Sequence, residues 1–581
     1  MSCTSKCSAK QACLEARENW KQIDSLRMGM DWDEEDLNKP QILIDDVWGT
    51  THPGNFHLDK LTQQVGIGIY EKGGKPSYCH VSDVCDGCAM GHSGMNYILL
   101  SRELIADMVE VHCSFIPFDG LVLVSGCDKS IPAHLKAAAR LDLPTIHVPG
   151  GSMRVGPNLT TSLKTGELSA KDKKGLADPD EIRDYKLMCT PSCGSCQVMG
   201  TASTMQCMSE ALGMALPGSA LCPTTLQEIL RYARKAGKQV MQLAESGITA
   251  RKILVKEAFI NALKVHAAIS GSTNALLHLP AIAHEVGIEL ETDLIDQINK
   301  DIPYLTNILP SGKYPTELFW FAGGVPMVQW MLKDYLDLNV LTVTGRTLGE
   351  NLEMLEKDGF FRRGIGMLNN YGVKAEEVIR PISKSEHKGS IAILKGNLAP
   401  GGSVVKFSAV PKEMYHHVGP ALVFNREEDC HDAIVKGKVK PGSVLIIRYE
   451  GPKGSGMPEM YMTTDALVAD EALNTTTALI TDGRFSGFSS GPCIGHVTPE
   501  AVEGGPIALA EDGDLIEIDI PNRKLNIVGI KGQRMDLKEI DEELNKRRKD
   551  WELPKECKNK TGVLKRYTDT AVSAMLGAYM K

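Results

Sequence analysis

Residues that can bind metal gather in the first half of the chain. Cys127, Asp128 and Lys129 are consecutive, so a soft thiolate ligand, a hard carboxylate ligand and an amine stand side by side. Cys193 and Cys196 follow with a Cys-x-x-Cys spacing, which lets two thiolates converge on one metal. With Cys127 as a third thiolate, a [4Fe-4S] cube would keep one iron open as a Lewis acid. A zinc site or a redox pair fits the same spacing, so the spacing alone leaves these alternatives open.

Cys189 adds a different interpretation of the same segment. Cys189, Cys193 and Cys196 have the Cys-x-x-x-Cys-x-x-Cys spacing of radical S-adenosylmethionine enzymes. We favour this alternative less, because Ser195 stands where those enzymes usually carry an aromatic residue and because Cys127 and its neighbours would have no role. A non-catalytic zinc-binding protein is a third hypothesis.

Loops rich in glycine carry the remaining candidates. Asp86 lies in one of them and is an oxygen ligand of the kind that Mg²⁺ prefers. Glu459 lies in a second such loop, and Arg484 and Ser486 follow an apolar run. Each segment alone is more typical of an ordinary turn. Cys85, beside Asp86, is also a metal-ligand type, but its apolar neighbours favour burial as a packing residue.

The elements that must position these residues indicate an α/β protein. Residues 120–126 form an apolar run bounded by glycines, which is typical of a buried parallel strand, and ligands collect at the carboxyl ends of such strands. From residue 41 to about 375, apolar runs alternate with helical patterns, which predicts a largely parallel sheet. After about 385, short strands predict a β-rich unit with a hairpin at 521–522 and a helical tail from about 536. We predict a lead-in at 1–38 and domains at 39–380 and 385–581.

Composition argues against several classes of protein. A chain of 581 residues is too long for one core, so two or three domains are expected. The net charge of −9 gives no basic surface for nucleic acid, and no apolar stretch reaches the roughly 20 residues that span a membrane. Sixteen cysteines without an apolar secretory segment favour a reducing, cytoplasmic compartment. We do not favour a second metal site at Cys3, Cys7 and Cys13.

Taken together, these segments resemble the dihydroxy-acid dehydratase/6-phosphogluconate dehydratase family. The matching segments are 53–58, 85–91, 101–103, 127–129, 194–196, 271–274, 396–400, 456–459 and 481–487. They occur in family order from about residue 39 onward. The resemblance implies an α/β domain, a barrel-like C-terminal domain that closes over the site, and usually a homodimer or homotetramer. The activity that it implies is a hydro-lyase reaction, in which a 2,3-dihydroxy carboxylate loses water to become a 2-oxo-3-deoxy acid.

The resemblance also implies metal ligands. Cys127 and Cys196 match ligands of an iron–sulfur cluster, whose open iron takes the 3-hydroxyl. Asp86, Asp128 and Glu459 match ligands of Mg²⁺, which binds the substrate carboxylate and 2-hydroxyl. Lys129 matches a lysine that is carbamylated in some members, which turns it into an oxygen ligand.

The same resemblance implies the catalytic and substrate-binding groups. Ser486 matches the base that removes the C2 proton. An ordinary serine is too weak for this, so neighbouring cations such as Mg²⁺ and Arg484 must lower its pKa. We expect Ser272, Thr273 and Arg484 to bind the substrate.

Two departures from the family pattern affect these expectations. Members with a [2Fe-2S] cluster carry a cysteine where this chain has Gly54. The third thiolate must therefore come from elsewhere, and Cys193 is our candidate. We expect a [4Fe-4S] cluster, with [2Fe-2S] as the alternative. The other departure is Ser270, which replaces a usual glycine.

The substrate is less constrained. Residues 448–453 resemble branched-chain biosynthetic members, which act on 2,3-dihydroxyisovalerate. Phe488 and residues 492–494 are more typical of sugar-acid dehydratases. We favour a sugar acid and keep the branched-chain substrate as the alternative.

Overall fold

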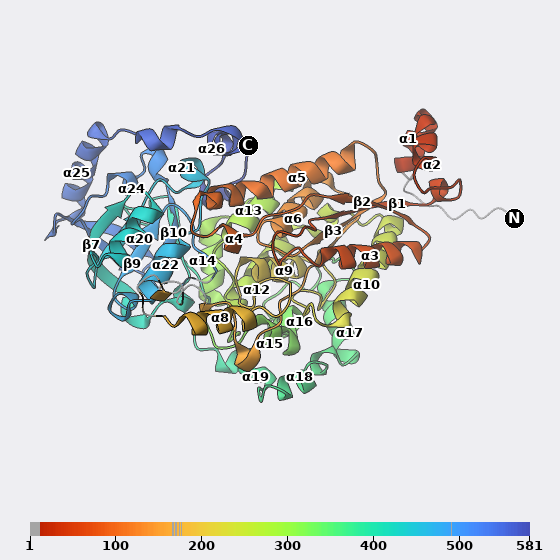
Figure 1. Ribbon diagram of the computed structural model, residues 1–581, viewed down its shortest axis with the longest axis horizontal. Coiled ribbons are helices and arrows are strands. Elements are labelled where there is room, and N and C mark those ends of the chain that lie inside the picture. Colours follow the sequence, from red (N-terminus) through yellow and green to blue (C-terminus); the bar gives the residue numbers. More distant parts are fainter. Residues whose placement is uncertain are drawn as a thin grey trace.

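In the computed structural model, the described residues are 12–581 except 165–167, 169–170, 173–174, 176, 488 and 490. The expectations for Cys3, Cys7, Phe488 and the side chain of Cys13 fall outside this part. Figure 1 shows two units, with the C-terminal one in blue on the left. The α/β architecture is confirmed, whereas the domain boundaries stay predictions.

A four-stranded parallel sheet forms the centre of the N-terminal unit. Its strands are β1 (Gln41–Asp46), β2 (Lys75–His80), β3 (Gly120–Ser125) and β4 (Thr145–Pro149), in the order β2-β1-β3-β4. Every residue of β1, β3 and β4 is buried, which explains the continuous apolar runs. Helices cover both faces: α3 (Leu58–Tyr70) packs on α10 (Gln227–Ser246), and α5 (Ile98–Ser114) packs on α6 (Ser130–Leu141) (Figure 1).

The predicted alternation of strands and helices ends earlier than expected. Within the described residues, no strand lies between Pro149 and Ala392. The apolar runs of this region form helices instead. The eleven residues of α9 are all buried, and α12, α13 and α16 pack against it. The helices of this region are α8 (Pro179–Met188), α9 (Thr201–Ala211), α11 (Ala250–Ile253), α12 (Lys256–Ile269), α13 (Ala275–Glu285), α14 (Thr292–Asp301), α15 (Thr316–Phe321), α16 (Gly324–Met331), α17 (Leu348–Lys357), α18 (Ile365–Asn369) and α19 (Ala375–Val378).

A curled nine-stranded sheet forms the C-terminal unit, in the order β13-β12-β11-β7-β8-β9-β10-β6-β5. Its strands are β5 (Ala392–Leu394), β6 (Gly402–Val405), β7 (His416–Phe424), β8 (Val444–Ile447), β9 (Ala478–Thr481), β10 (Cys493–Thr498), β11 (Leu515–Asp519), β12 (Lys524–Ile530) and β13 (Gln533–Arg534). Strands β7 to β10 pair in parallel and the flanking pairs are antiparallel. The backbone N–H of Leu525 donates to the carbonyl of Lys395 at 3.0 Å, so the two ends of the sheet meet. This closure gives the expected barrel-like shape.

The expected hairpin and helical tail are both present. β11 and β12 pair across the turn at 521–522, and α25 (Leu537–Asp550) begins with a capping box between Asp536 and Glu539. The other helices of this unit are α20 (Glu427–Val435), α21 (Pro452–Ser455), α22 (Tyr461–Val468), α23 (Glu471–Asn474), α24 (Pro506–Leu509) and α26 (Gly562–Thr570). Among the described residues, no helix has the length and apolar character needed to cross a membrane.

The end of the chain returns to the N-terminal unit and is held there by Arg102 of α5. Its guanidinium is fully buried and donates to the carbonyls of Gly577 and Ala578, at 2.8 and 3.0 Å, and contacts Nδ1 of His278 at 3.1 Å. The matching segment 101–103 therefore contains a structural clamp between α5 and the C-terminal end of the chain.

Candidate active site and metal centre

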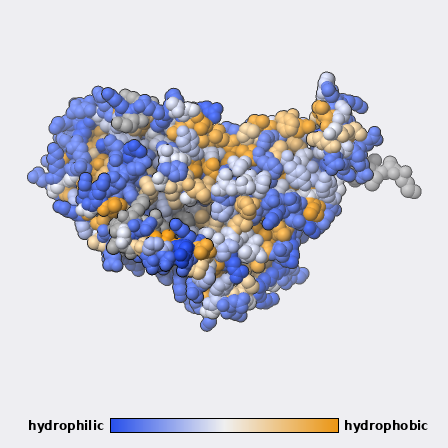
Figure 2. Space-filling model, in the orientation of Figure 1, coloured by the Kyte–Doolittle hydropathy of each residue, from blue (hydrophilic) through white to orange (hydrophobic). Residues whose placement is uncertain are grey.

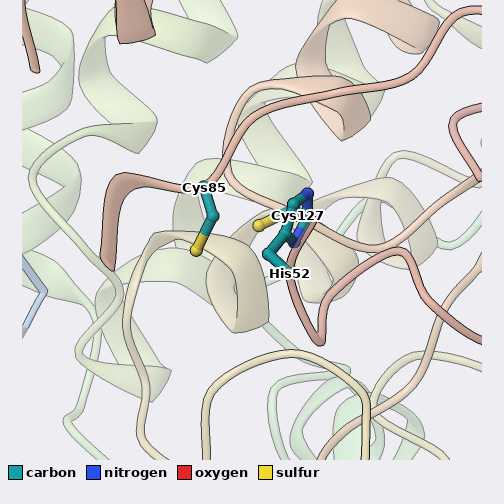
Figure 3. Close-up of side chains that lie close together, drawn as sticks. All are labelled: His52, Cys85 and Cys127. Carbon is teal, nitrogen blue, oxygen red and sulfur yellow. The ribbon is translucent and has the colours of Figure 1, made fainter. Parts of the chain in front are cut away.

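The carboxyl edge of the parallel sheet carries one group of metal-ligand types. His52 follows β1, Cys85 follows β2 at the start of α4 (Asp86–Ala89), and Cys127 follows β3. Their ligand atoms all lie within 4.8 Å of one another, and Figure 3 shows the three side chains gathered at one point. Three neighbouring strands of one sheet thus deliver them to one place, as the parallel topology predicts.

His52 supports this group through both of its ring nitrogens. Nδ1 accepts the backbone N–H of Gly54 at 3.2 Å, so the hydrogen is on Nε2, which donates to Asp83 at 2.8 Å. Asp83 also accepts from Asn55 at 2.9 Å and from Ser130. Since both nitrogens are engaged, His52 acts as a support that fixes the loop beneath the thiols.

Cys196 joins Cys85 and Cys127 from a separate loop. That loop is fixed by backbone bonds from Ser195 to Gly151 and from Met153 to Ser195, both 2.9 Å long. Cys85, Cys127 and Cys196 all line one cavity of about 610 Å³. A hydrogen bond with Cys85 lowers the pKa of Cys127, but burial and the carboxylates nearby outweigh it and raise that pKa to about 12. Burial, followed by the charges of Asp128 and Cys85, raises the pKa of Cys196 as well.

Cys193, our sequence-based third ligand, is not among the residues that line the cavity. Its carbonyl accepts the hydroxyl of Thr224 at 2.6 Å, and the charges nearest its thiol are those of Lys60 and Asp59. The structure instead places Cys85 beside Cys127. Sequence reasoning discounted Cys85 because of its apolar neighbours, although its position directly after a strand was the signal that pointed to it.

A second group consists of three carboxylates drawn from both units. Asp86 and Asp128 come from the parallel sheet edge, and Glu459 comes from the loop between α21 and α22. Their oxygens lie within 4.8 Å of one another, and all three side chains are buried. The sequence predicted all three, and the fold brings them together. Carboxylate oxygens are the donors that Mg²⁺ prefers.

Two buried cations partly balance these carboxylates. Lys129 Nζ lies 2.9 Å from Asp86 and 3.8 Å from Asp128, and Arg484 pairs with Asp86 at 3.0 Å and with Glu459. Burial alone would raise the pKa of Asp86, but Lys129 and Arg484 outweigh it and hold the pKa below its ordinary value. Burial and the charge of Asp86 raise the pKa of Asp128 to about 7. Three carboxylates against two cations leave one negative charge in excess, which favours a cation at this site.

The remaining predicted residues surround this centre at different depths. Ser486 lines the large cavity with Asp128 and Glu459, whereas Lys129 and Arg484 are buried behind the carboxylates. Ser272 and Thr273 are not in the lining of that cavity. They line a smaller one with Ser486.

Ser272 also takes part in a buried hydrogen-bond chain. Its hydroxyl bonds with Thr201 at 2.9 Å, and Asn274 donates to both Thr201 and Glu459, at 2.9 and 2.8 Å. The segment 271–274 therefore orients Glu459, a role that the motif alone did not reveal.

The two donor groups fit two different metals. Soft thiols on one wall of the cavity suit an iron–sulfur cluster, and hard carboxylates on the adjoining wall suit Mg²⁺. Asp86 directly follows Cys85, and Asp128 directly follows Cys127, so each pair places one donor in each group. A bound molecule can therefore face both groups at once.

Comparison with known proteins gives concordant matches along the chain. The family model described as dihydroxy-acid/6-phosphogluconate dehydratase N-terminal matches residues 39–351, and its C-terminal counterpart matches residues 377–578. The dihydroxy-acid dehydratase of Halothermothrix orenii is 44% identical over 96% of this chain and 97% of the relative. That of Caldanaerobacter subterraneus subsp. tengcongensis is 45% identical over 96% of both chains. The dihydroxy-acid dehydratase of Methanococcoides burtonii is 43% identical over 94% of this chain and 95% of the relative.

Proposed function

Because the chain belongs to the dihydroxy-acid/6-phosphogluconate dehydratase family, we propose that it dehydrates a branched 2,3-dihydroxy acid, with 2,3-dihydroxyisovalerate as the substrate. The chain is an enzyme, a hydro-lyase. The relatives do not support our preference for a sugar acid, since those compared are named dihydroxy-acid dehydratases, and the branched-chain alternative fits better. A place in branched-chain amino-acid biosynthesis is part of this proposal, and the cytoplasmic location stays a prediction.

One observation carries the proposal: thiols, carboxylates and Ser486 line the same cavity. Cys85, Cys127 and Cys196 would hold the iron–sulfur cluster, of the [4Fe-4S] type with [2Fe-2S] as the alternative. Mg²⁺ would be held by Asp86, Asp128 and Glu459. When bound, the two groups supply Lewis acids for the leaving hydroxyl and for the substrate carboxylate with its 2-hydroxyl. This assignment replaces Cys193 by Cys85 as the third thiolate.

The protein residues would then perform the proton transfer. Ser486 removes the C2 proton, and the enol that remains after loss of the 3-hydroxyl becomes a 2-oxo acid. Arg484 holds Asp86 and Glu459 in place through its two ion pairs, so it orients the carboxylates and does not contact the substrate directly. Ser272 orients the same region through Thr201.

The side chain of Lys129 can act in one of two chemical forms, an ammonium group or a carbamate. As an ammonium group, it pairs with Asp86 at 2.9 Å and lies 3.8 Å from Asp128. As a carbamate, it would add an oxygen ligand for Mg²⁺ and would need a further cation to balance its charge. Mass spectrometry of the peptide that contains Lys129, from enzyme prepared with and without bicarbonate, separates these two forms.

We also propose that the enzyme is a homodimer or homotetramer. β2 is an edge strand, and apolar side chains are exposed on it and on the helices to either side. These side chains are Ile67, Tyr70, Tyr78, Met108, Val111 and Phe115. Figure 2 shows orange side chains along the margin that α5 forms in Figure 1. Light scattering of the purified protein measures the number of chains.

An anaerobic assay tests the proposed reaction. The full chain, reconstituted with iron, sulfide and Mg²⁺, is offered 2,3-dihydroxyisovalerate and a panel of aldonates, and 2-oxo acid is measured. We expect the highest kcat/KM with 2,3-dihydroxyisovalerate, and loss of turnover in Ser486→Ala without loss of iron. A higher kcat/KM with an aldonate would overturn the substrate, and no turnover on any compound would overturn the dehydratase.

A further inference from the structure

Lys406 is a half-buried lysine that the reaction above does not use. It follows β6, the strand between β10 and β5 in the curled sheet, and its Nζ is shielded from solvent. Within the described part of the chain, this nitrogen has no hydrogen-bond partner. A buried ammonium group without a partner is costly, so such a position indicates a group that exchanges its proton or meets a ligand.

A small cavity connects Lys406 with Ser486. It has a volume of about 20 Å³, and its lining includes Lys406, Thr273, Ser486, Ser489 and Cys493. Ser486 also lines the large cavity, so this serine separates Lys406 from the space for the substrate. A space of this size holds one water molecule or one hydroxyl group, and is too small for a second carboxylate or a phosphate. Its dimensions suit the transfer of a proton.

The groups that face Lys406 provide no counter-charge. His266 lies nearby, and burial lowers its pKa to about 4, so it is neutral. Burial raises the pKa of Cys493 to about 12, so it stays protonated. With no carboxylate among the described residues near enough to oppose it, burial lowers the pKa of Lys406 to about 7. The side chain of Lys406 can therefore be a neutral amine near neutral pH.

We propose that Lys406 accepts the hydroxyl proton of Ser486, directly or through one water molecule, and so creates the alkoxide that acts as the base. The amine and hydroxyl become an ammonium and an alkoxide, with no gain or loss of electrons. The alkoxide then takes the C2 proton, and the serine hydroxyl returns that proton to the departing hydroxide, which leaves as water. This inference rests on the proposed function.

Arg484 is a poor substitute for this role. Its guanidinium already pairs with Asp86 and Glu459, and Nε donates to the carbonyl of Met457 at 2.7 Å. Its charge is thus balanced by two carboxylates, and it cannot lose a proton at neutral pH. Lys406 is the group that combines a free amine with access to Ser486.

Two substitutions separate proton transfer from simple charge. Lys406→Met removes the amine, and Lys406→Arg keeps a permanent positive charge that cannot accept a proton. We expect both to lower kcat by about 100-fold or more, the usual scale of general base catalysis, and to remove the rise in kcat/KM with pH near 7. Lys395→Met is the control, since Lys395 is an exposed lysine of the same unit.

Chemical rescue completes the test. Lys406→Ala should regain activity when ethylamine is added, and the regained rate should follow the fraction of unprotonated amine. Iron content and cluster absorbance report whether each variant is loaded as the wild type is. Full activity in Lys406→Arg, or an unchanged pH profile in Lys406→Met, would overturn the inference. If the wild-type enzyme itself dehydrates no dihydroxy acid, the proposed function fails instead.

Discussion

Cys85 and Cys193 give opposite expectations for cluster assembly. Cys85→Ser removes a thiol that lies beside Cys127, so we expect the reconstituted protein to lose most of its iron and acid-labile sulfide. Cys193→Ser should keep both, because its thiol is outside the cavity lining. Cys79→Ser is the control, since Cys79 is a half-buried cysteine of β2 that is not in the cavity lining. Loss of iron in Cys193→Ser with retention in Cys85→Ser would restore the sequence-based assignment.

Lys406 should also affect how the free energy of unfolding depends on pH. Its pKa falls from 10.5 to about 7 on folding, so between these values the unfolded chain binds more protons than the folded one. The free energy of unfolding should therefore rise with pH over this interval, and this contribution should be missing in Lys406→Met. At pH 7 or below, we expect Lys406→Met to be more stable than the wild type by up to a few kcal/mol.

Denaturant titrations of both proteins from pH 6 to about pH 10 measure this difference. Taking the difference matters because Glu210 acts in the opposite direction: burial raises its pKa to about 8, so its contribution falls as pH rises. Both proteins contain Glu210, and its effect cancels. A constant difference between wild type and Lys406→Met across this range would contradict the lowered pKa.

At the residue scale, the sequence predicted those site residues whose role follows from the chemical type of the side chain. Asp86, Asp128 and Glu459 are oxygen donors in glycine-rich or strand-end positions, and the fold brings them together. The choice between Cys85 and Cys193 depends on which way two loops turn, which the sequence does not specify. Lys406 could not be found either, because a lysine without a partner looks like any other lysine until its surroundings are known.

At the scale of elements, the Ser486 loop depends on a close contact with the start of α9. A Cβ added at Gly487 would lie 2.3 Å from Cα of Gly200, a backbone atom that cannot move aside. Gly487→Ala should therefore displace Ser486, and we expect kcat to fall by about 100-fold, as misplacement of a catalytic group by about 1 Å commonly causes. Iron content should stay unchanged, because none of the thiols is on this loop.

Kinetics and iron analysis of Gly487→Ala measure these two effects. Gly366→Ala is a suitable control, because a Cβ there meets no atom within 4 Å. Unchanged kcat in Gly487→Ala would show that the loop tolerates the displacement and that its contact with α9 does not position Ser486.

The sequence predicted the individual strands of the parallel sheet correctly, but it predicted that the alternation of strands and helices would continue too far along the chain. The runs around 41, 120 and 145 became β1, β3 and β4, because fully buried parallel strands need continuous apolar residues. The same composition between residues 150 and 391 forms buried helices. Short apolar runs do not separate a buried helix from a buried strand, so the predicted alternation continued too far.

At the scale of the whole molecule, Arg102 of α5 joins the N-terminal unit to the C-terminal tail. Arg102→Met would remove a side-chain donor from the carbonyls of Gly577 and Ala578, although Ala578 would keep the hydroxyl of Tyr567. It would also remove one of the two cations that pair with Glu103 and leave Lys136 as the other. We expect a loss of about 3–5 kcal/mol of stability, as for other broken buried ion pairs, and faster proteolysis of the C-terminal tail. Arg231→Met, which removes an exposed pair with Glu228, should cost less than about 1 kcal/mol. Thermal unfolding compares them, and equal midpoints would contradict the clamp.

Mg²⁺ should act as a second link between the units, because its proposed ligands come from both. Adding Mg²⁺ should raise the unfolding temperature of the wild type, by an amount that corresponds to about 2.7 kcal/mol at a hundred times the dissociation constant. Glu459→Gln, which removes the ligand from the C-terminal unit, should lose most of this shift. Thermal scans with and without chelator measure it, and an undiminished shift in Glu459→Gln would place the cation elsewhere.

The cavity lined by Cys85, Cys127 and Cys196 also bears on how the enzyme would lose activity through oxidation. The cavity has a volume of about 610 Å³, and dioxygen and peroxide are smaller than any dihydroxy acid that it would admit. The size of the cavity therefore does not protect the thiol-lined wall from small oxidants. An oxidant would meet the same surface as the substrate. With the proposed cluster on these thiols, the working lifetime of the enzyme would depend on the oxidants around it and on the supply of iron for repair. Its activity in a culture would then report recent exposure to air as well as the amount of protein.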